Sequence, residues 1–86
     1  MAKVTIYTKP LCPYCVRAMM LLKSKDAEIE EKSAAYDANL KAEMIQRSGG
    51  ARTYPQIFVG ETHVGGSDDL MALERAGKLD PLLEAA

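Results

Sequence analysis

Cys12 and Cys15 are the residues of this chain best suited to chemistry, because they are its only thiols and lie three positions apart. A disulfide across so short a loop would remove little entropy from the unfolded chain, so a structural staple explains the pair poorly. A cytosolic Cys-x-x-Cys is more often redox-active or metal-binding. A tetrahedral zinc site would need two more ligands. The other candidate ligands in the sequence are His63 and carboxylates, so the sequence does not favour a zinc site. The spacing therefore favours redox chemistry, with metal ligation and simple packing as the alternatives.

The position of Cys12 indicates how such a thiol would be activated. Cys12 directly precedes a predicted helix that starts at Pro13, where a missing N–H costs nothing. The start of a helix favours an anion, and Lys9 and Arg17 add positive charge nearby. Such surroundings can lower a thiol pKa to between about 3.5 and 7.5. We therefore interpret Cys12 as the nucleophile and Cys15, deeper in the helix, as the resolving thiol.

The first half of the sequence predicts two strands and two helices. Apolar residues alternate between Val4 and Lys9 as in a strand, and the helix after Pro13 follows. Residues 27–35 predict a second strand, polar enough for a sheet edge. Asp37 is the expected N-cap of the next helix, which Ser48-Gly49-Gly50 ends.

The second half predicts a β-hairpin and a further helix. Residues 56–65 read as a hairpin that turns at Gly60-Glu61. Ser67 is the expected N-cap of a helix with an acidic first turn, and Gly77 ends it. Residues 80–83 form a last short turn. The chain is therefore predicted to be an α/β protein of order βαβαββα, with a parallel strand pair and an antiparallel hairpin in one mixed sheet.

Length and composition predict one domain over residues 1–86. Hydrophobic residues make up 48% and charged residues 27%, which is ordinary for a globular protein. The net charge of −1 gives no basic surplus for nucleic acid. The longest apolar run, residues 18–22, is too short to cross a bilayer, and the N-terminus lacks the apolar core of a signal peptide. We therefore expect a cytoplasmic protein without nucleic-acid or membrane partners.

Several separated motifs resemble those of the bacterial dithiol glutaredoxins. In the family's order, the chain carries Tyr7-Thr8-Lys9, Cys12-Pro13-Tyr14-Cys15, Thr53-Tyr54-Pro55-Gln56-Ile57-Phe58, Gly65-Gly66-Ser67-Asp68-Asp69-Leu70 and Gly77-Lys78-Leu79-Asp80-Pro81-Leu82-Leu83. The likeness covers nearly the whole chain. It implies a thioredoxin-like fold, a four-stranded mixed sheet flanked by helices, with glutathione as co-substrate and no metal. It also implies reduction of protein disulfides through both cysteines and of glutathione mixed disulfides through Cys12 alone.

The resemblance further implies a glutathione site. Its residues would be Lys9, Tyr14, Thr53, Tyr54, Pro55, Gln56, Gly66, Ser67 and Asp68. Pro55 is expected to be cis and to face the dithiol, so that the Tyr54 backbone pairs with the cysteine part of glutathione. The helix start at Ser67 and Asp68 would hold the γ-glutamyl group.

The remaining assignments of that site concern its two ends. Lys9 and Gln56 would take the glycine carboxylate of glutathione, and Tyr14 would flank its sulfur. The chain departs from the commonest family pattern in three places: Tyr54 replaces a frequent valine, Ser67 stands where a cysteine is often found, and the second strand is unusually polar. None of these departures removes a chemical requirement.

Other residues that could do chemistry are expected to be structural. His63 lies in the hairpin, far in sequence from the cysteines, and is interpreted as a surface or packing residue. The methionines Met19, Met20, Met44 and Met71 are interpreted as core fillers. Tyr7 and Tyr36 receive no chemical role.

Two alternatives to the leading function stay open at this stage. The same dithiol could draw electrons from thioredoxin reductase, or Cys12 of two subunits could hold an iron–sulfur cluster together with two glutathiones. The Pro13-Tyr14 insert and the available Cys15 favour catalysis. The expected partners are glutathione, disulfide-containing or glutathionylated proteins and, indirectly, glutathione reductase, with the chain acting as a monomer.

Overall fold

The elements of the fold follow the predicted order closely. The computed structural model describes residues 3–85. In chain order the elements are β1 (Lys3–Thr8), α1 (Pro13–Ser24), β2 (Glu28–Ser33), α2 (Ala38–Arg47), β3 (Gln56–Val59), β4 (Thr62–Gly65), α3 (Ser67–Arg75) and α4 (Leu79–Glu84). The order βαβαββα is thereby confirmed, and the last turn predicted at residues 80–83 is part of the short helix α4.

The four strands form one mixed sheet in the order β2-β1-β3-β4. β1 runs parallel to β2 and antiparallel to β3, and β3 and β4 form the antiparallel hairpin. Because β2 pairs only with β1, it is an edge strand, and none of its residues is fully buried. The polar composition of residues 27–35 thus has the expected cause.

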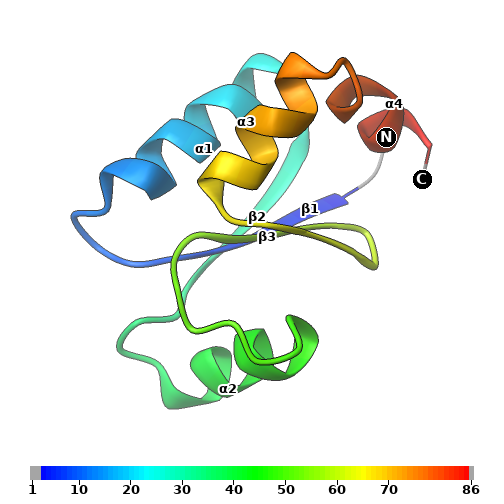
Figure 1. The fold of residues 1–86 in the computed structure, drawn as a ribbon. Coiled ribbons are helices and arrows are strands. Elements are labelled where there is room, and N and C mark those ends of the chain that lie inside the picture. Colours follow the sequence, from blue (N-terminus) through cyan, green and yellow to red (C-terminus); the bar gives the residue numbers. More distant parts are fainter. Residues whose placement is uncertain (1–2, 86) are drawn as a thin grey trace.

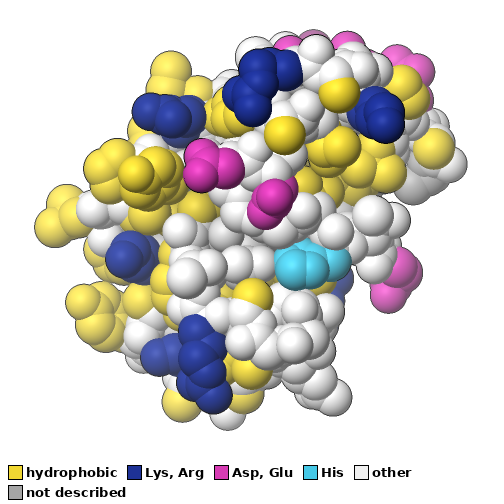
Figure 2. All heavy atoms as spheres, in the orientation of Figure 1, with side chains coloured by type: hydrophobic (Ala, Val, Ile, Leu, Met, Phe, Trp, Pro, Cys, Tyr) yellow, Lys and Arg dark blue, Asp and Glu magenta, His cyan; other side chains and the backbone are white. Residues whose placement is uncertain are grey.

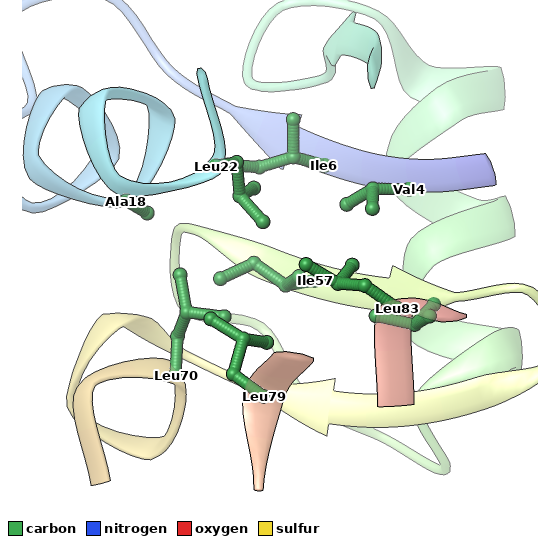
Figure 3. Packing of buried hydrophobic residues seen from close by; sticks show 9 residues of the cluster. Val4, Ile6, Ala18, Leu22, Ile57, Leu70, Leu79 and Leu83 are labelled. Atoms are coloured by element: carbon green, nitrogen blue, oxygen red, sulfur yellow. The ribbon is translucent and has the colours of Figure 1, made fainter. Parts of the chain in front are cut away.

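Helices cover both faces of the sheet, as Figure 1 shows: α1 and α3 lie on one face and α2 lies on the other. Side chains of β1 alternate between the two faces, so that Val4 and Ile6 enter the core under α1 and α3, and Tyr7 enters the core under α2. The larger core is drawn in Figure 3 and consists of Val4, Ile6, Ala18, Leu22, Ile57, Val59, Leu70, Leu79 and Leu83. This packing fixes α1 and α3, whose N-termini build the site described below.

A polar cluster fastens α2 to the sheet. The buried Tyr7 donates its hydroxyl to Glu43 and accepts a hydrogen bond from Arg47 Nη1 at 2.8 Å. Lys32 Nζ lies 2.7 Å from Glu43 Oε2. The hydrogen bond from Lys32, together with that from Tyr7, lowers the pKa of Glu43, whereas burial, together with the bond to Glu43, raises the pKa of Tyr7. Tyr7, which has no role predicted from the sequence, therefore joins β1 to α2.

Two local predictions are wrong, and one is confirmed. Met20 is 66% exposed instead of filling the core, because it lies outside the face of α1 that buries Cys15, Ala18 and Leu22. The N-cap of α3 is Gly66 and not Ser67. Asp37 caps α2 as predicted, accepting hydrogen bonds from two backbone N–H groups at 3.0 Å.

Within residues 3–85, no helix combines the length and the apolar character that a bilayer crossing requires. Over the same residues, no group of three or more His, Cys, Asp or Glu side chains is arranged to hold a metal ion.

Candidate active site

The dithiol lies at the N-terminus of α1, directly after β1. Leu11, with φ of 56°, takes the left-handed conformation that turns the chain from the strand toward the helix. Cys12 is the N-cap, and its Sγ accepts a hydrogen bond from the backbone N–H of Cys15 at 3.3 Å. Pro13 occupies the first helical position, as the sequence predicts. Both thiols are 4% exposed, so the neighbouring dipoles act on them with little screening by water.

The two thiols have opposite pKa shifts. Burial raises the pKa of Cys12, but hydrogen bonds from the Cys15 side chain and from the N–H groups of Cys15 and Tyr14 outweigh burial. With a contribution from Lys9, the net pKa of Cys12 is lowered. Burial and the hydrogen bond to Cys12 raise the pKa of Cys15 to about 11. At neutral pH the proton of the pair therefore stays on Cys15, and Cys12 has the more thiolate character.

Arg17, which the sequence suggests as a second positive charge for Cys12, has a different neighbour. Its guanidinium lies 5.9 Å from the centre of the Tyr14 ring. Lys9 is the cation that lowers the pKa of Cys12. The helix start and one lysine, without Arg17, account for the positive surroundings of the thiol.

A groove of about 380 Å³ lies between the loop before β3 and the start of α3, and Tyr14 of the Cys-x-x-Cys motif contributes to its lining. It is lined by most of the predicted glutathione residues, namely Tyr14, Thr53, Tyr54, Pro55, Gln56, Gly66, Ser67 and Asp68. Lys9 instead lines a second cavity of about 290 Å³ together with Cys12 and Cys15. The structure thus joins residues more than 50 positions apart in one groove, whereas Lys9 lines the separate cavity that both cysteines line.

The loop before β3 contributes the Tyr54–Pro55 peptide bond, which is cis, as the family resemblance implies. Pro55 is buried, and the Tyr54 side chain packs partly against the core under α2. The Tyr54 hydroxyl is enclosed, and over residues 3–85 it has no hydrogen-bond partner. Burial raises its pKa. The tyrosine that replaces the frequent valine therefore belongs to the wall of the groove.

The start of α3 forms the opposite wall. Gly65 has φ of 115°, and Gly66 donates its N–H to Asp69 Oδ2 at 3.0 Å. A Cβ on Gly66 would lie 3.6 Å from the Pro55 carbonyl oxygen, so the two walls approach closely here. Ser67 is 5% exposed as a residue. Its hydroxyl has no hydrogen-bond partner among residues 3–85. The Gly66 N–H is therefore occupied by Asp69, and the Ser67 hydroxyl is enclosed within this wall.

Four lining residues, Ala51, His63, Gly65 and Asp69, are missing from the sequence-based site. His63 Nε2 lies 2.8 Å from Gln56 Oε1, and its ring stacks on Phe58 with centroids 4.7 Å apart. Figure 2 shows the histidine side chain, in cyan, at the surface. The packing prediction for His63 is thus confirmed, but its place in the groove depends on strand register, which the sequence does not display. Gln56 is buried, and its amide is occupied by protein partners.

Comparison with known proteins agrees with this geometry. The sequence model of the glutaredoxin family matches residues 4–64. A curated glutaredoxin of Pseudomonas aeruginosa is 54% identical over 99% of this chain and 100% of its own. The solution structure of a glutaredoxin from Brucella melitensis is 57% identical, with a TM-score of 0.82 over 98% of this chain and 90% of its own. A buckwheat glutaredoxin–glutathione complex is 30% identical, with a TM-score of 0.84 over 95% of this chain and 76% of its own. The chain therefore belongs to the glutaredoxin family, the thiol–disulfide oxidoreductases that act with glutathione.

Proposed function

We propose that this glutaredoxin reduces glutathione mixed disulfides through Cys12 and protein disulfides through Cys12 and Cys15 together. The observation that carries the proposal is the buried thiol pair at the start of α1, in which Cys12 Sγ accepts the Cys15 N–H at 3.3 Å and the two pKa values shift in opposite directions. A lowered pKa supplies the attacking thiolate, and a raised pKa keeps the second thiol protonated until it is needed.

In the monothiol reaction, the Cys12 thiolate attacks the glutathione sulfur of a mixed disulfide. The bond between that sulfur and the protein sulfur breaks, and the protein leaves as a thiolate that takes up a proton. A second glutathione, as thiolate, then attacks the Cys12-bound glutathione. Oxidised glutathione leaves and the Cys12 thiolate returns, so that one free glutathione has released one protein thiol and the disulfide now lies in oxidised glutathione.

In the dithiol reaction, Cys12 attacks a protein disulfide and Cys15 then attacks the Cys12 sulfur, which releases the reduced protein and leaves a Cys12–Cys15 disulfide. Two glutathiones then reduce this disulfide and leave as oxidised glutathione. Before its attack, Cys15 must lose its proton. Two causes of its raised pKa, the hydrogen bond and the charge interaction with Cys12, require a free Cys12 sulfur. Once Cys12 is bonded to the substrate, these two causes are removed, and what remains is burial, which raises the pKa of Cys15, and the backbone and charge of Lys9, which lower it. The pKa of Cys15 therefore falls at the step in which it must act as nucleophile.

The groove is the proposed glutathione site. The backbone of Tyr54 beside Pro55 would pair with the cysteine part of glutathione, with Tyr14 flanking the sulfur. The backbone N–H groups of Ser67 and Asp68 would hold the γ-glutamyl carboxylate, since Gly66 has no side chain with which to cap them. The Asp68 carboxylate would hold the ammonium group.

At the other end of glutathione, the proposal changes two roles. Gln56 supports the Thr53 loop instead of reaching for the glycine carboxylate, because its amide nitrogen is bonded to Thr53 at 3.1 Å. Lys9 is exposed beside Cys12, where its charge favours the thiolate. It would meet the glycine carboxylate only if that end of glutathione extends past the cysteines.

The proposed partners are glutathionylated or disulfide-containing proteins, with glutathione reductase regenerating glutathione. We expect the protein to act as a monomer in the cytoplasm, where a reduced glutathione pool is maintained. Sedimentation of the purified protein and fractionation of the source cells test these two expectations.

The decisive experiment is turnover of a small glutathione mixed disulfide, coupled to glutathione reductase. The unsubstituted protein should turn over. Cys12→Ser should lose at least about a hundredfold in rate, because a hydroxyl is not ionised at neutral pH. Cys15→Ser should keep substantial monothiol activity but lose the reduction of a protein disulfide. Full activity in Cys12→Ser would refute the assignment of the nucleophile.

A further inference from the structure

His63 is fixed at two points although it is exposed. Its ring stacks on the buried Phe58 at an interplanar angle of 24°. Its Nε2 lies 2.8 Å from Gln56 Oε1. A surface side chain with a single role in packing would not need the second contact, so the hydrogen bond calls for an explanation.

The register of the hairpin creates this arrangement. His63 is the direct cross-strand partner of Phe58, whereas Ile57 pairs with Gly65. Val64 is therefore the extra residue of a bulge, beyond which β4 continues to the start of α3. Gln56 and Phe58 alternate on β3 and point to the same face, so the His63 ring can cover Phe58 and still reach Gln56.

The direction of each hydrogen bond follows from chemistry. The Thr53 carbonyl can only accept, so the Gln56 nitrogen, 3.1 Å away, must donate to it. The Gln56 oxygen then faces His63 and must accept, which requires the proton on His63 Nε2. The result is a continuous chain of donors from His63 through Gln56 to Thr53.

This series of hydrogen bonds ends at Thr53, the residue directly before Tyr54 and Pro55. Gln56 Nε2 also lies 3.1 Å from the Thr53 hydroxyl oxygen, so one amide holds both the backbone and the side chain of Thr53. The loop from Thr53 to Gln56 is thereby closed on itself, with its Gln56 end held from outside by His63. A shift of this loop would move the backbone of Tyr54, which forms one wall of the groove.

We propose that His63 is a positioning residue of the active site, which orients Gln56 and through it the Thr53–Pro55 wall that binds glutathione. The inference rests on the proposed function of the groove and assigns it a supporting residue. It requires the Nε2 proton and not a positive charge, because the ring donates to Gln56 in both its neutral and its cationic form.

The test uses turnover of the small glutathione mixed disulfide by four single variants and one double variant. His63→Leu removes the donor and should raise KM about two- to tenfold, the effect of one hydrogen bond, with little change in kcat. His63→Gln keeps an N–H near the position of Nε2 and should restore most of the lost KM. Thr62→Val, an exposed neighbour on the same strand, is the matched control and should leave KM unchanged.

The fourth variant, Gln56→Leu, separates positioning from direct contact with the ligand. If His63 acts through Gln56, adding His63→Leu to Gln56→Leu should cause no further rise in KM. Fully additive effects would overturn the positioning role, since His63 would then act without Gln56. An unchanged KM in folded His63→Leu would overturn it as well.

A measurement on the unsubstituted protein covers the case in which a variant fails to fold. The ¹⁵N chemical shifts of the His63 ring report which nitrogen carries the proton, and the Nε2–H form is expected. The Nδ1–H form would overturn the proposal. Absence of turnover by the unsubstituted protein would instead refute the proposed function, so the two failures are distinguishable.

Discussion

The helices α1 and α3 both begin beside the dithiol and the groove, but different groups meet their first backbone N–H groups. At α1 the N-cap is Cys12, whose sulfur accepts from the N–H of Cys15, and the first turn contains no acidic residue. At α3 the N-cap is Gly66, and the Asp69 carboxylate accepts from its N–H. One start thus holds a reactive sulfur, and the other holds a permanent carboxylate.

This difference explains what each helix start can do. The positive end of α1 is left to the Cys12 sulfur, so the dipole and the N–H groups favour its thiolate. At α3 two carboxylates, Asp68 and Asp69, stand beside N–H groups that a glycine cannot cap. In the proposed site, the carboxylate of a zwitterion would bind the backbone N–H groups and its ammonium would bind Asp68. The start of α1 would thus supply the attacking sulfur, and the start of α3 would hold the γ-glutamyl group.

The largest predicted effect comes from disturbing the α3 start. A Cβ on Gly65 would overlap the Asp69 carboxylate, and the φ of 115° at this position disfavours any residue other than glycine. In Gly65→Ala, Asp69 must rotate away from the Gly66 N–H while the backbone is strained. We expect unfolding free energy to fall by about 2–4 kcal/mol, from the lost cap and the strain together, measured by urea denaturation.

Gly66→Ala is the matched control for that substitution. Its Cβ would meet only the Pro55 carbonyl oxygen, at the ordinary distance of 3.6 Å, and its φ is −93°. Stability should fall by less than about 1 kcal/mol, the usual difference between glycine and alanine at an N-cap. The added methyl group narrows the groove, so KM for the glutathione mixed disulfide should rise. Equal losses of stability in the two variants would show that the contact with Asp69 is unimportant.

The contrast between Gly65 and Gly66 also illustrates the limits of the sequence. Alternation, caps and the Cys-x-x-Cys spacing were sufficient to predict the sheet, its polar edge strand and the position of Cys12, because all of these depend on near neighbours. Ser67 was wrongly predicted to cap α3, since serine is a common N-cap, but the helix starts one residue earlier.

Contacts that depend on how strands pair or on which cavity a residue lines cannot be predicted from local sequence patterns. His63 reaches Gln56 because Val64 is the extra residue of a β-bulge in the hairpin. No local sequence pattern predicts this bulge. Lys9 and the groove are assigned to one ligand by the family resemblance, yet they lie in different cavities around the dithiol. The chemical groups were thus predictable, whereas their grouping in space required the fold.

A smaller effect is expected from removing one negative charge at the α3 start. Asp68→Asn should raise KM for the glutathione mixed disulfide about two- to fivefold, the range of an exposed ion pair, and the difference should shrink at high salt. Asp69→Asn makes the same change of charge one residue further along. It should raise KM less, because Asp69 is bonded to Gly66 and the asparagine oxygen can still accept that bond. If Asp69→Asn had the larger effect, the ammonium group would have to lie at Asp69 instead.

The smallest predicted effect comes from giving the first turn of α1 an acidic residue, as the first turn of α3 has. It tests whether the absence of such an acid in α1 favours the Cys12 thiolate. Pro13→Asp places a carboxylate in the first turn of α1, where it opposes a second anion. We expect the pKa of Cys12 to rise by about 0.2–0.7 units, the range of one charge at a helix end.

The thiolate absorbance is titrated in a Cys15→Ser background, in which one thiol remains and the serine hydroxyl can still donate to its sulfur. Pro13→Asn controls for the loss of the proline ring and for the N–H that it frees. Because a carboxylate disfavours the thiolate, the titration midpoint of Pro13→Asp must lie at higher pH than that of Pro13→Asn. Coincident midpoints would mean that the missing acid in the first turn does not set the pKa of Cys12, and that the hydrogen bonds to its sulfur suffice.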